Sequence, residues 1–223
     1  MTVILVLLTF TILLTVDYIY SRRLMKRSVV APAAEPAAPR LRPTFVAGFE
    51  VPDNLRYHPG HTWALSESPD LVRAGIDSVA ARLAGRIDRL ALPQRGQWVR
   101  QGQRIWTIER GGEKAEMVSP IEGIVTDVNE AVATDPELAR RDPYGDGWLV
   151  KVQAPDLKTS FRNLLGGTVA RKWMEEAALR LRMRIPEVAG LVAQDGGVAV
   201  DDLHAHLPAG TSWVDVTREF FLT

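Results

Sequence analysis

The sequence predicts a mainly β domain that follows a membrane-spanning helix and precedes a C-terminal α/β extension. From residue 57 onward, short runs alternate apolar and polar residues between glycines and prolines, which favours a compact β sandwich or barrel. A long apolar run opens the chain, and a charged amphipathic pattern follows the β region. With 223 residues, the chain has room for one sizeable domain and its appendages.

Composition excludes several classes of function. The formal net charge is zero and the isoelectric point is 6.9, so no nucleic-acid partner is expected. The absence of cysteine excludes disulfides, thiolate metal sites and cysteine nucleophiles. Of the 27 basic residues counted as Lys plus Arg, only five are lysines, so chemistry that requires lysine has few possible sites.

The N-terminus has the pattern of a membrane anchor. Thr2 to Ile19 is almost entirely apolar, with Asp17 as its only charge, and is long enough to cross a bilayer as a helix. Basic residues follow the apolar run directly: Arg22, Arg23, Lys26 and Arg27. Their position predicts a single-pass anchor with basic flank over residues 1–28 and a soluble domain in the cytoplasm. The alternative, a signal peptide cleaved near Ala31–Ala34, would have no basic residue before its apolar run.

Residues 29–56 are predicted to be an Ala/Pro-rich linker and lead-in. Repeated prolines between Val29 and Pro43 disfavour helix and sheet and favour an extended, semi-rigid spacer. Such a spacer would hold the next domain at a distance from the membrane.

Residues 57–156 are predicted to form the β domain. Alternating runs indicate strands at Leu71–Ile76, Gly123–Val128 and Trp148–Val152. Two short helices are expected, at Ser78–Ala84 and Pro136–Arg140.

A tight β-hairpin is predicted at the centre of this domain. Two apolar-polar runs between Arg104 and Pro120 flank the pair Gly111-Gly112. Adjacent glycines readily adopt the positive φ angles that a two-residue hairpin turn requires. The tip of this hairpin therefore carries no side chain.

Several motifs of the β domain resemble the glycine cleavage system H protein family, which is related to lipoyl and biotinyl domains. The resemblance rests on Y-H-P-G-H-T-W at Tyr57–Trp63, Ser119-Pro120 with Gly123, and D-P-Y-G-D-G-W at Asp142–Trp148. It implies a barrel-sandwich hybrid that carries a lipoyl-lysine on an exposed hairpin. In the family this arm moves between enzymes, and the protein presents and shelters it.

The sequence departs from the family at the attachment position. The family lysine lies three residues after a Glu and eight before the Pro of the Ser-Pro pair, and here both counts reach Gly112. Because glycine cannot form the amide, we expect no cofactor. The alternative is a lipoyl group on Lys114, two residues further along; the neighbouring charges also suit an ordinary solvated hairpin surface.

Other candidate sites do not point to catalysis or to a metal. His58 and His61 are spaced like metal ligands but have no third ligand close in sequence, and the family resemblance makes this segment structural. Asp142–Trp148 is typical of a turn that leads into a buried strand. A compact cluster near the C-terminus also lacks a further ligand: Asp201, Asp202, His204 and His206. No nucleotide-binding or nucleophile motif is present, so neither enzyme activity nor a small-molecule substrate is expected.

The C-terminal region is predicted to contain an amphipathic helix at residues 157–185 and an extension at 186–223. Residues at helical spacing form one apolar stripe: Trp173, Met174, Ala177, Ala178 and Leu181. Gly166-Gly167 is expected to interrupt the helix early, and Gly190–Val200 has a hairpin pattern. The aromatic end either completes the core or docks on a partner, and the sequence leaves this choice open.

These features predict a membrane-anchored subunit, without a lipoyl group, that tethers or assembles a membrane-associated complex such as a redox or respiratory one. Its expected partners are protein subunits of that complex and the membrane itself. The alternative is a membrane-anchored lipoyl carrier modified at Lys114. A soluble glycine cleavage component is opposed by the apolar N-terminus and by Gly112.

Overall fold

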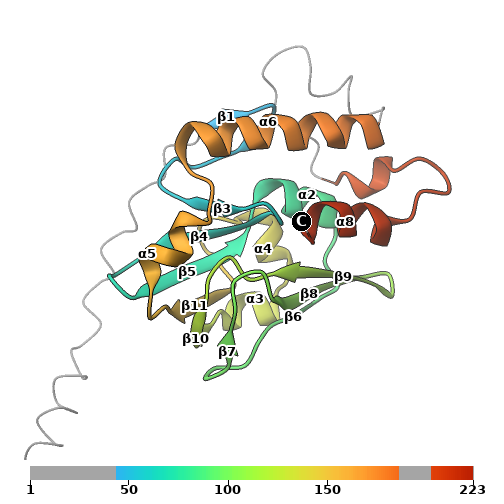
Figure 1. The fold of residues 1–223 in the computed structure, drawn as a ribbon. Coiled ribbons are helices and arrows are strands. Elements are labelled where there is room, and N and C mark those ends of the chain that lie inside the picture. Colours follow the sequence, from blue (N-terminus) through green and yellow to red (C-terminus); the bar gives the residue numbers. More distant parts are fainter. Residues whose placement is uncertain (1–43, 186–201, 223) are drawn as a thin grey trace, which may run out of the picture. The chain divides into compact units, whose positions relative to one another are not determined.

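The computed structural model describes residues 44–185 and 202–222, which belong to one compact unit spanning residues 41–223 (Figure 1). The predicted anchor, most of the linker and the predicted hairpin at 190–200 lie outside the described residues. Within the described ranges, no helix is both long enough and apolar enough to cross a bilayer.

The described strands and helices occur in the following order along the chain. The strands are β1 (Phe45–Val46), β2 (Phe49–Glu50), β3 (Arg56–His58), β4 (Thr62–Ser66), β5 (Leu71–Ile76), β6 (Arg89–Ala91), β7 (Trp98–Val99), β8 (Arg104–Arg110), β9 (Glu113–Val118), β10 (Gly123–Val128) and β11 (Val150–Gln153). The helices are α2 (Ser78–Ala84), α3 (Glu130–Thr134), α4 (Glu137–Arg141), α5 (Leu157–Arg162), α6 (Gly167–Arg184), the 3₁₀ turn η1 (His204–His206) and α8 (Trp213–Phe221).

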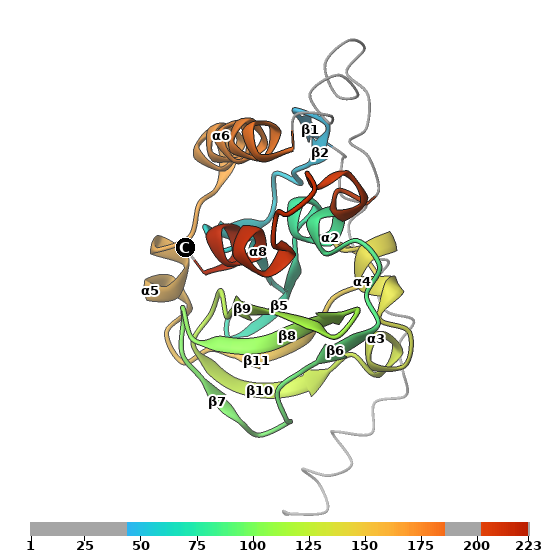
Figure 2. The ribbon, with the colours of Figure 1, turned by 90° about the vertical axis from the view of Figure 1, so that its right-hand side faces the viewer.

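The strands form two main antiparallel sheets. The larger has the order β3-β4-β5-β11-β10-β7, the smaller has the order β6-β8-β9, and β1 pairs separately with β2. The predicted alternation is confirmed in the larger sheet, where Val72, Ala74 and Val152 are buried and the residues between them are partly exposed. The prediction of a mainly β fold is therefore confirmed, with a helical C-terminal part added to it (Figures 1 and 2).

Helix α2 has the bounds predicted for it because its N-terminus is capped locally. Asp77 accepts hydrogen bonds from Val79 N and Ala80 N at 3.0 and 2.9 Å, and the helix stops at Gly85, whose φ is 59°. An aspartate that caps the first free N–H groups, followed by a glycine past the last turn, is a common pair of helix boundaries.

The D-P-Y-G-D-G-W motif ties distant segments together. Tyr144 donates its hydroxyl to Glu50 O at 2.7 Å and accepts from Ser78 N at 2.9 Å. Trp63 donates its indole N–H to Ile76 O and to Pro143 O, at 2.8 and 3.0 Å. Burial raises the pKa of Tyr144 well above its ordinary value, so the hydroxyl stays protonated and available as a donor. The motif is a structural turn, as the sequence indicates.

The lead-in before residue 57 is more than a spacer. Phe49, Val51 and Leu55 are almost completely buried in the core, and Pro52 O accepts a hydrogen bond from the Tyr57 hydroxyl at 3.0 Å. The segment 44–56 therefore packs with the β domain: its buried apolar side chains belong to the same hydrophobic core, and β2 contacts α2. The part of the predicted linker and lead-in that the structure describes, residues 44–56, is therefore packed against the β domain.

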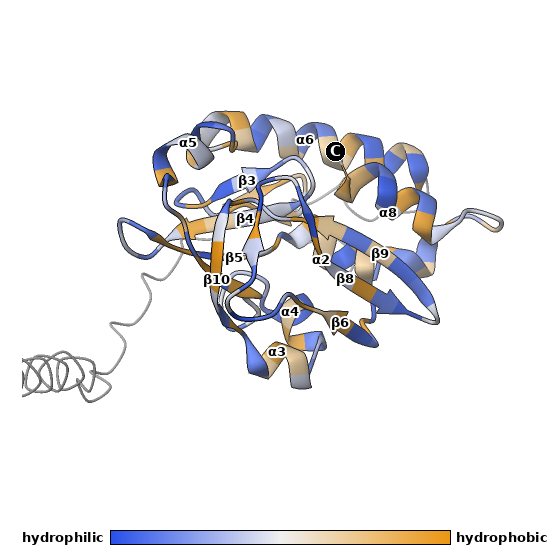
Figure 3. Cartoon of the chain, turned by 60° about the horizontal axis from the view of Figure 1, so that its bottom comes forward, coloured by the Kyte–Doolittle hydropathy of each residue, from blue (hydrophilic) through white to orange (hydrophobic). Residues whose placement is uncertain are grey.

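Two glycines divide the predicted C-terminal helix, as expected. Helix α5 ends at Arg162, and α6 begins at Gly167, whose φ is 55°. The predicted stripe of α6 faces the core, where Met174, Ala177 and Leu181 are buried; hydrophobic and hydrophilic positions both occur along this helix (Figure 3).

The aromatic end of the chain is part of the core. Trp213, Phe220 and Phe221 are each at most 2% exposed. Helix α8, which carries them, packs against β9 and α2 (Figure 2). The choice that the sequence left open is therefore decided in favour of packing within the chain.

Candidate functional site

The β8–β9 hairpin has the predicted two-residue turn. Arg110 pairs with Glu113, and Gly111 and Gly112 between them have φ angles of 55° and 85°. Two successive positive φ angles are characteristic of a type I′ turn, which matches the twist of the flanking strands. A Cβ placed on either glycine would have no other atom within 4 Å, so the tip projects into open space.

The two faces of the hairpin differ in burial. Trp106, Ile108 and Met117 are buried and point to the core side. Glu109, Lys114 and Glu116 alternate with them and lie on the other side. Because side chains alternate across a strand, the period-two pattern of the sequence already separates these two sets.

Lys114, on β9, carries the amino group of this hairpin. Its side chain is 66% exposed, and its Nζ lies 3.1 Å from Oε1 of Glu109, its directly opposite neighbour on β8. An ion pair this exposed contributes little stability, about 0–1 kcal/mol, so the ammonium is held loosely and remains accessible. Lys114 is thus placed where a large enzyme could reach it.

The two histidines near the start of the domain serve the core. His58 Nδ1 accepts from Gly60 N at 3.0 Å, and His61 Nδ1 lies 2.8 Å from the Asp77 carboxylate with both side chains fully buried. The ring of His61 also packs 4.7 Å from that of Trp173. This arrangement agrees with a structural role for both histidines.

The pKa of His58 is lowered, first by burial and second by the neighbouring His61. The folded state therefore binds fewer protons than the unfolded state, so the stability that His58 contributes is fully present above the ordinary histidine pKa of about 6.5 and is lost as the pH falls below it. Each unit by which the pKa is lowered corresponds to about 1.4 kcal/mol. His58→Asn, which keeps an acceptor for Gly60 N, should flatten this pH dependence in urea unfolding; an unchanged slope would contradict the assignment.

The C-terminal cluster of acidic and histidine residues does not form a metal centre in the part described. Asp202 pairs with Arg110, and His204 packs edge-on against Trp213 with ring centroids 6.3 Å apart. Across residues 44–185 and 202–222, no three His, Cys, Asp or Glu side chains are grouped so that they could hold a metal ion. Asp201 lies outside the described residues.

The sequence analysis missed one group of residues around the hairpin. Arg110, which precedes the turn, binds both Asp202 and the end of helix α2. The only signal in the sequence was Gly85, which follows the predicted helix and whose Cβ would clash with Arg110 and Asp202. Ninety-two positions separate Arg110 from Asp202, so no local pattern could pair them.

Residues 55–177, more than half of the chain, match the model of the family described as glycine cleavage H-protein. The chain belongs to this family. The matched range contains both main sheets, the hairpin and Lys114, and it ends within α6. Residues 178–223, including η1 and α8, lie beyond it.

Individual H proteins are similar to this member over the same region. A probable glycine cleavage system H protein 2 of Sulfurisphaera tokodaii is 34% identical over 128 residues, which are 56% of this chain and 86% of the relative. The glycine cleavage system H protein of Alteromonas mediterranea is 38% identical over 106 residues, which are 48% of this chain and 82% of the relative. The crystal structure of the Mycobacterium marinum H protein aligns with a TM-score of 0.48 and 28% identity, covering 57% of this chain and 98% of that one.

Membership in this family overturns two expectations drawn from the sequence. The predicted tethering or assembly subunit of a membrane complex is wrong, and so is the predicted absence of a cofactor, because the H protein is a lipoyl carrier of the glycine cleavage system. Both expectations gave too much weight to Gly112. The structure has an exposed amine two residues beyond it, on the same hairpin. A carrier is not itself a catalyst, which agrees with the expectation that the chain is no enzyme.

Proposed function

We propose that this H-protein family member is a lipoyl carrier whose attachment residue is Lys114. The observation that carries the proposal is the exposed amine of Lys114 beside a type I′ turn, inside the region that matches the family. The other lysines of the described part lie elsewhere, at Lys151 on β11, Lys158 on α5 and Lys172 on α6. Lys114 is thus the lysine of the hairpin.

The residues of the hairpin fit a lipoyl group at Lys114 and not at the position implied by the family pattern. Gly112 has no side chain, and its φ of 85° disfavours any other residue. Lys114 lies two residues along the strand, about 6–7 Å away. The proposal therefore includes a displaced attachment point within the barrel-sandwich framework of the family.

Attachment is an acyl transfer to nitrogen. The Nζ of Lys114, after losing a proton, forms an amide with the carboxyl carbon of a lipoyl-adenylate, and AMP leaves with the bonding electron pair. The reaction removes the positive charge of Lys114 and ends its ion pair with Glu109. The bound group would supply a reversible thiol–disulfide pair, while the chain supplies the projecting hairpin and its rigid base.

The proposed partners are the other proteins of the glycine cleavage system, which the names of the relatives imply.

The test of the proposed function is the intact mass of the protein purified from its native source. We expect the bare polypeptide plus one amide-linked lipoyl group, mapped to the peptide that contains Lys114. A native protein with the bare mass, which also resists a purified lipoate-attaching enzyme, would refute the carrier function.

We also propose that residues 1–28 anchor this carrier in the membrane with its domain in the cytoplasm, supported by the apolar run and the basic residues that follow it. Residues 29–43 would then be the spacer, followed by the β domain, the helical segment and the C-terminal extension. Protease added to spheroplasts should leave the domain intact and should digest it after lysis. Digestion before lysis, or recovery of the full-length chain in the soluble fraction, would contradict the anchor.

A further inference from the structure

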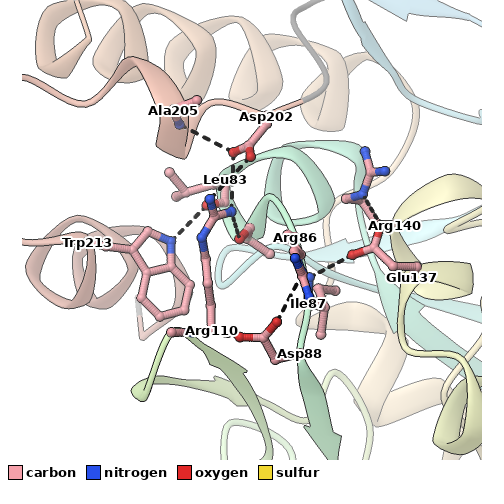
Figure 4. Close-up of polar contacts among 12 residues, drawn as sticks. Leu83, Arg86, Ile87, Asp88, Arg110, Glu137, Arg140, Asp202, Ala205 and Trp213 are labelled. Atoms are coloured by element: carbon pink, nitrogen blue, oxygen red, sulfur yellow. Dashed lines mark hydrogen bonds and ion pairs between the residues drawn. The ribbon is translucent and has the colours of Figure 1, made fainter.

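The last turn of helix α2 receives donors from distant parts of the chain (Figure 4). Leu203 N donates to Arg82 O at 3.0 Å, Trp213 Nε1 donates to Leu83 O at 2.8 Å, and Arg110 Nη1 donates to Ala84 O at 3.0 Å. Carbonyls in the last turn of a helix have no partner within the helix. Here the C-terminal segment and the hairpin supply those partners, so three elements meet at one junction.

Arg110 and Asp202 form the centre of this junction. Arg110 Nη1 and Nη2 lie 3.3 and 3.2 Å from the two carboxylate oxygens of Asp202, a bidentate arrangement that fixes both side chains. The two side chains are only 17% and 35% exposed. Gly85 leaves them the space, because a Cβ there would clash with Arg110 Nη1 and Asp202 Oδ1.

The junction holds the hairpin at the point where its own sheet ends. Strand β6 pairs with β8 only as far as Glu109, so residues 110–113 have no third strand beside them. Two contacts fix this end: the Arg110–Asp202 pair and the hydrogen bond from Gly111 N to Asp88 Oδ2 at 2.7 Å. Lys114 follows directly and pairs with Glu109, the last residue of β8 that pairs with β6, so this end of the hairpin borders the backbone from which the Lys114 side chain extends.

We propose that Arg110 and Asp202 are positioning residues for the modification of Lys114. Their contact selects the hairpin orientation in which a lipoate-attaching enzyme finds the Lys114 amine. The inference rests on the proposed function and goes beyond the family framework, because Asp202 lies outside the matched residues 55–177. The C-terminal segment of this chain thereby acts on a site that the family domain carries.

The test compares Arg110→Gln with Arg104→Gln. Arg104 lies on the same strand and forms an exposed ion pair with Glu116 at 2.8 Å, so it is a matched control far from the junction. Purified unmodified chains would be labelled by a lipoate-attaching enzyme with lipoate and ATP, at temperatures where every variant is folded. If the hairpin has the orientation that the enzyme recognises in only a fraction of the molecules, the apparent affinity of the enzyme for the chain falls in proportion to that fraction.

We expect Arg110→Gln to raise the KM for the chain about tenfold with kcat unchanged, and Arg104→Gln to leave both unchanged. Amide exchange at Gly111, Gly112 and Glu113 should accelerate in Arg110→Gln only. Asp202→Asn should shift the KM in the same direction, and the double variant should be no worse than Arg110→Gln, because the two residues act as one unit.

The outcomes separate this inference from the proposed function. If Arg110→Gln is labelled with the KM and kcat of the unaltered chain, the inference is overturned, even if that variant is less stable. A lower kcat at unchanged KM would also overturn it. Additive effects of Arg110→Gln and Asp202→Asn would also overturn it. If the unaltered chain is not labelled at all, the proposed function fails and the inference fails with it.

Discussion

Removal of residues 212–223 should abolish the cooperative unfolding transition of the described unit. This deletion takes away α8 and with it the buried side chains of Trp213, Phe220 and Phe221. It also removes the helix that packs against β9. Truncation of a single buried tryptophan or phenylalanine to alanine costs about 3–5 kcal/mol, and a domain of this kind has about 5–15 kcal/mol in total.

Single substitutions refine this prediction. Trp213→Ala should lower the free energy of unfolding by about 3–5 kcal/mol in urea titrations. Trp213→Phe keeps most of the ring but loses the hydrogen bond to Leu83 O, so a smaller loss of about 1–3 kcal/mol is expected.

Arg218→Ala is the matched control on the same helix. Its side chain is 64% exposed, so the change should stay within about 0.5 kcal/mol. A truncated chain that unfolds cooperatively at the original midpoint would show that α8 is an appended element rather than part of the core.

Lys114→Arg should eliminate lipoyl attachment completely while leaving the fold intact. Arginine keeps the positive charge beside Glu109, but its guanidinium stays protonated and cannot form the amide. The ion pair is largely exposed, so the free energy of unfolding should change by less than about 1 kcal/mol. The measurement is the intact mass after labelling with lipoate, ATP and a purified lipoate-attaching enzyme.

Lys158→Arg and Lys172→Arg serve as controls, since both residues are exposed lysines on helices away from the hairpin and should be labelled like the unaltered chain. A further variant combines Lys114→Arg with Gly112→Lys, which returns a lysine to the position implied by the family pattern. Its labelling would show that the attaching enzyme accepts either position. Retention of the lipoyl mass in Lys114→Arg alone would place the attachment elsewhere and refute the assignment of Lys114.

Local features of the sequence determined the strands, helix α2 and the hairpin. Alternation at Leu71–Ile76 and the pair Gly111-Gly112 specify conformation through side-chain period and permitted φ angles, which depend only on near neighbours. Because such signals concern only near neighbours, they also limited the prediction of function. The sequence identified Lys114 as the alternative attachment residue, but reasoning from Gly112 led to the wrong prediction of a tethering subunit without a lipoyl group.

Only the tertiary structure decided the roles of the two ends of the described unit. Phe49 and Val51 were placed in the lead-in to the β domain, and for Trp213 and Phe220 the sequence left open whether they belong to the core or to an interface; all four are buried. Burial depends on which distant surfaces an apolar segment covers, and a pattern of apolar residues does not name those surfaces. The junction of Arg110 with Asp202 has the same origin: it forms across 92 positions because α8 brings the C-terminal segment back to α2 and the hairpin.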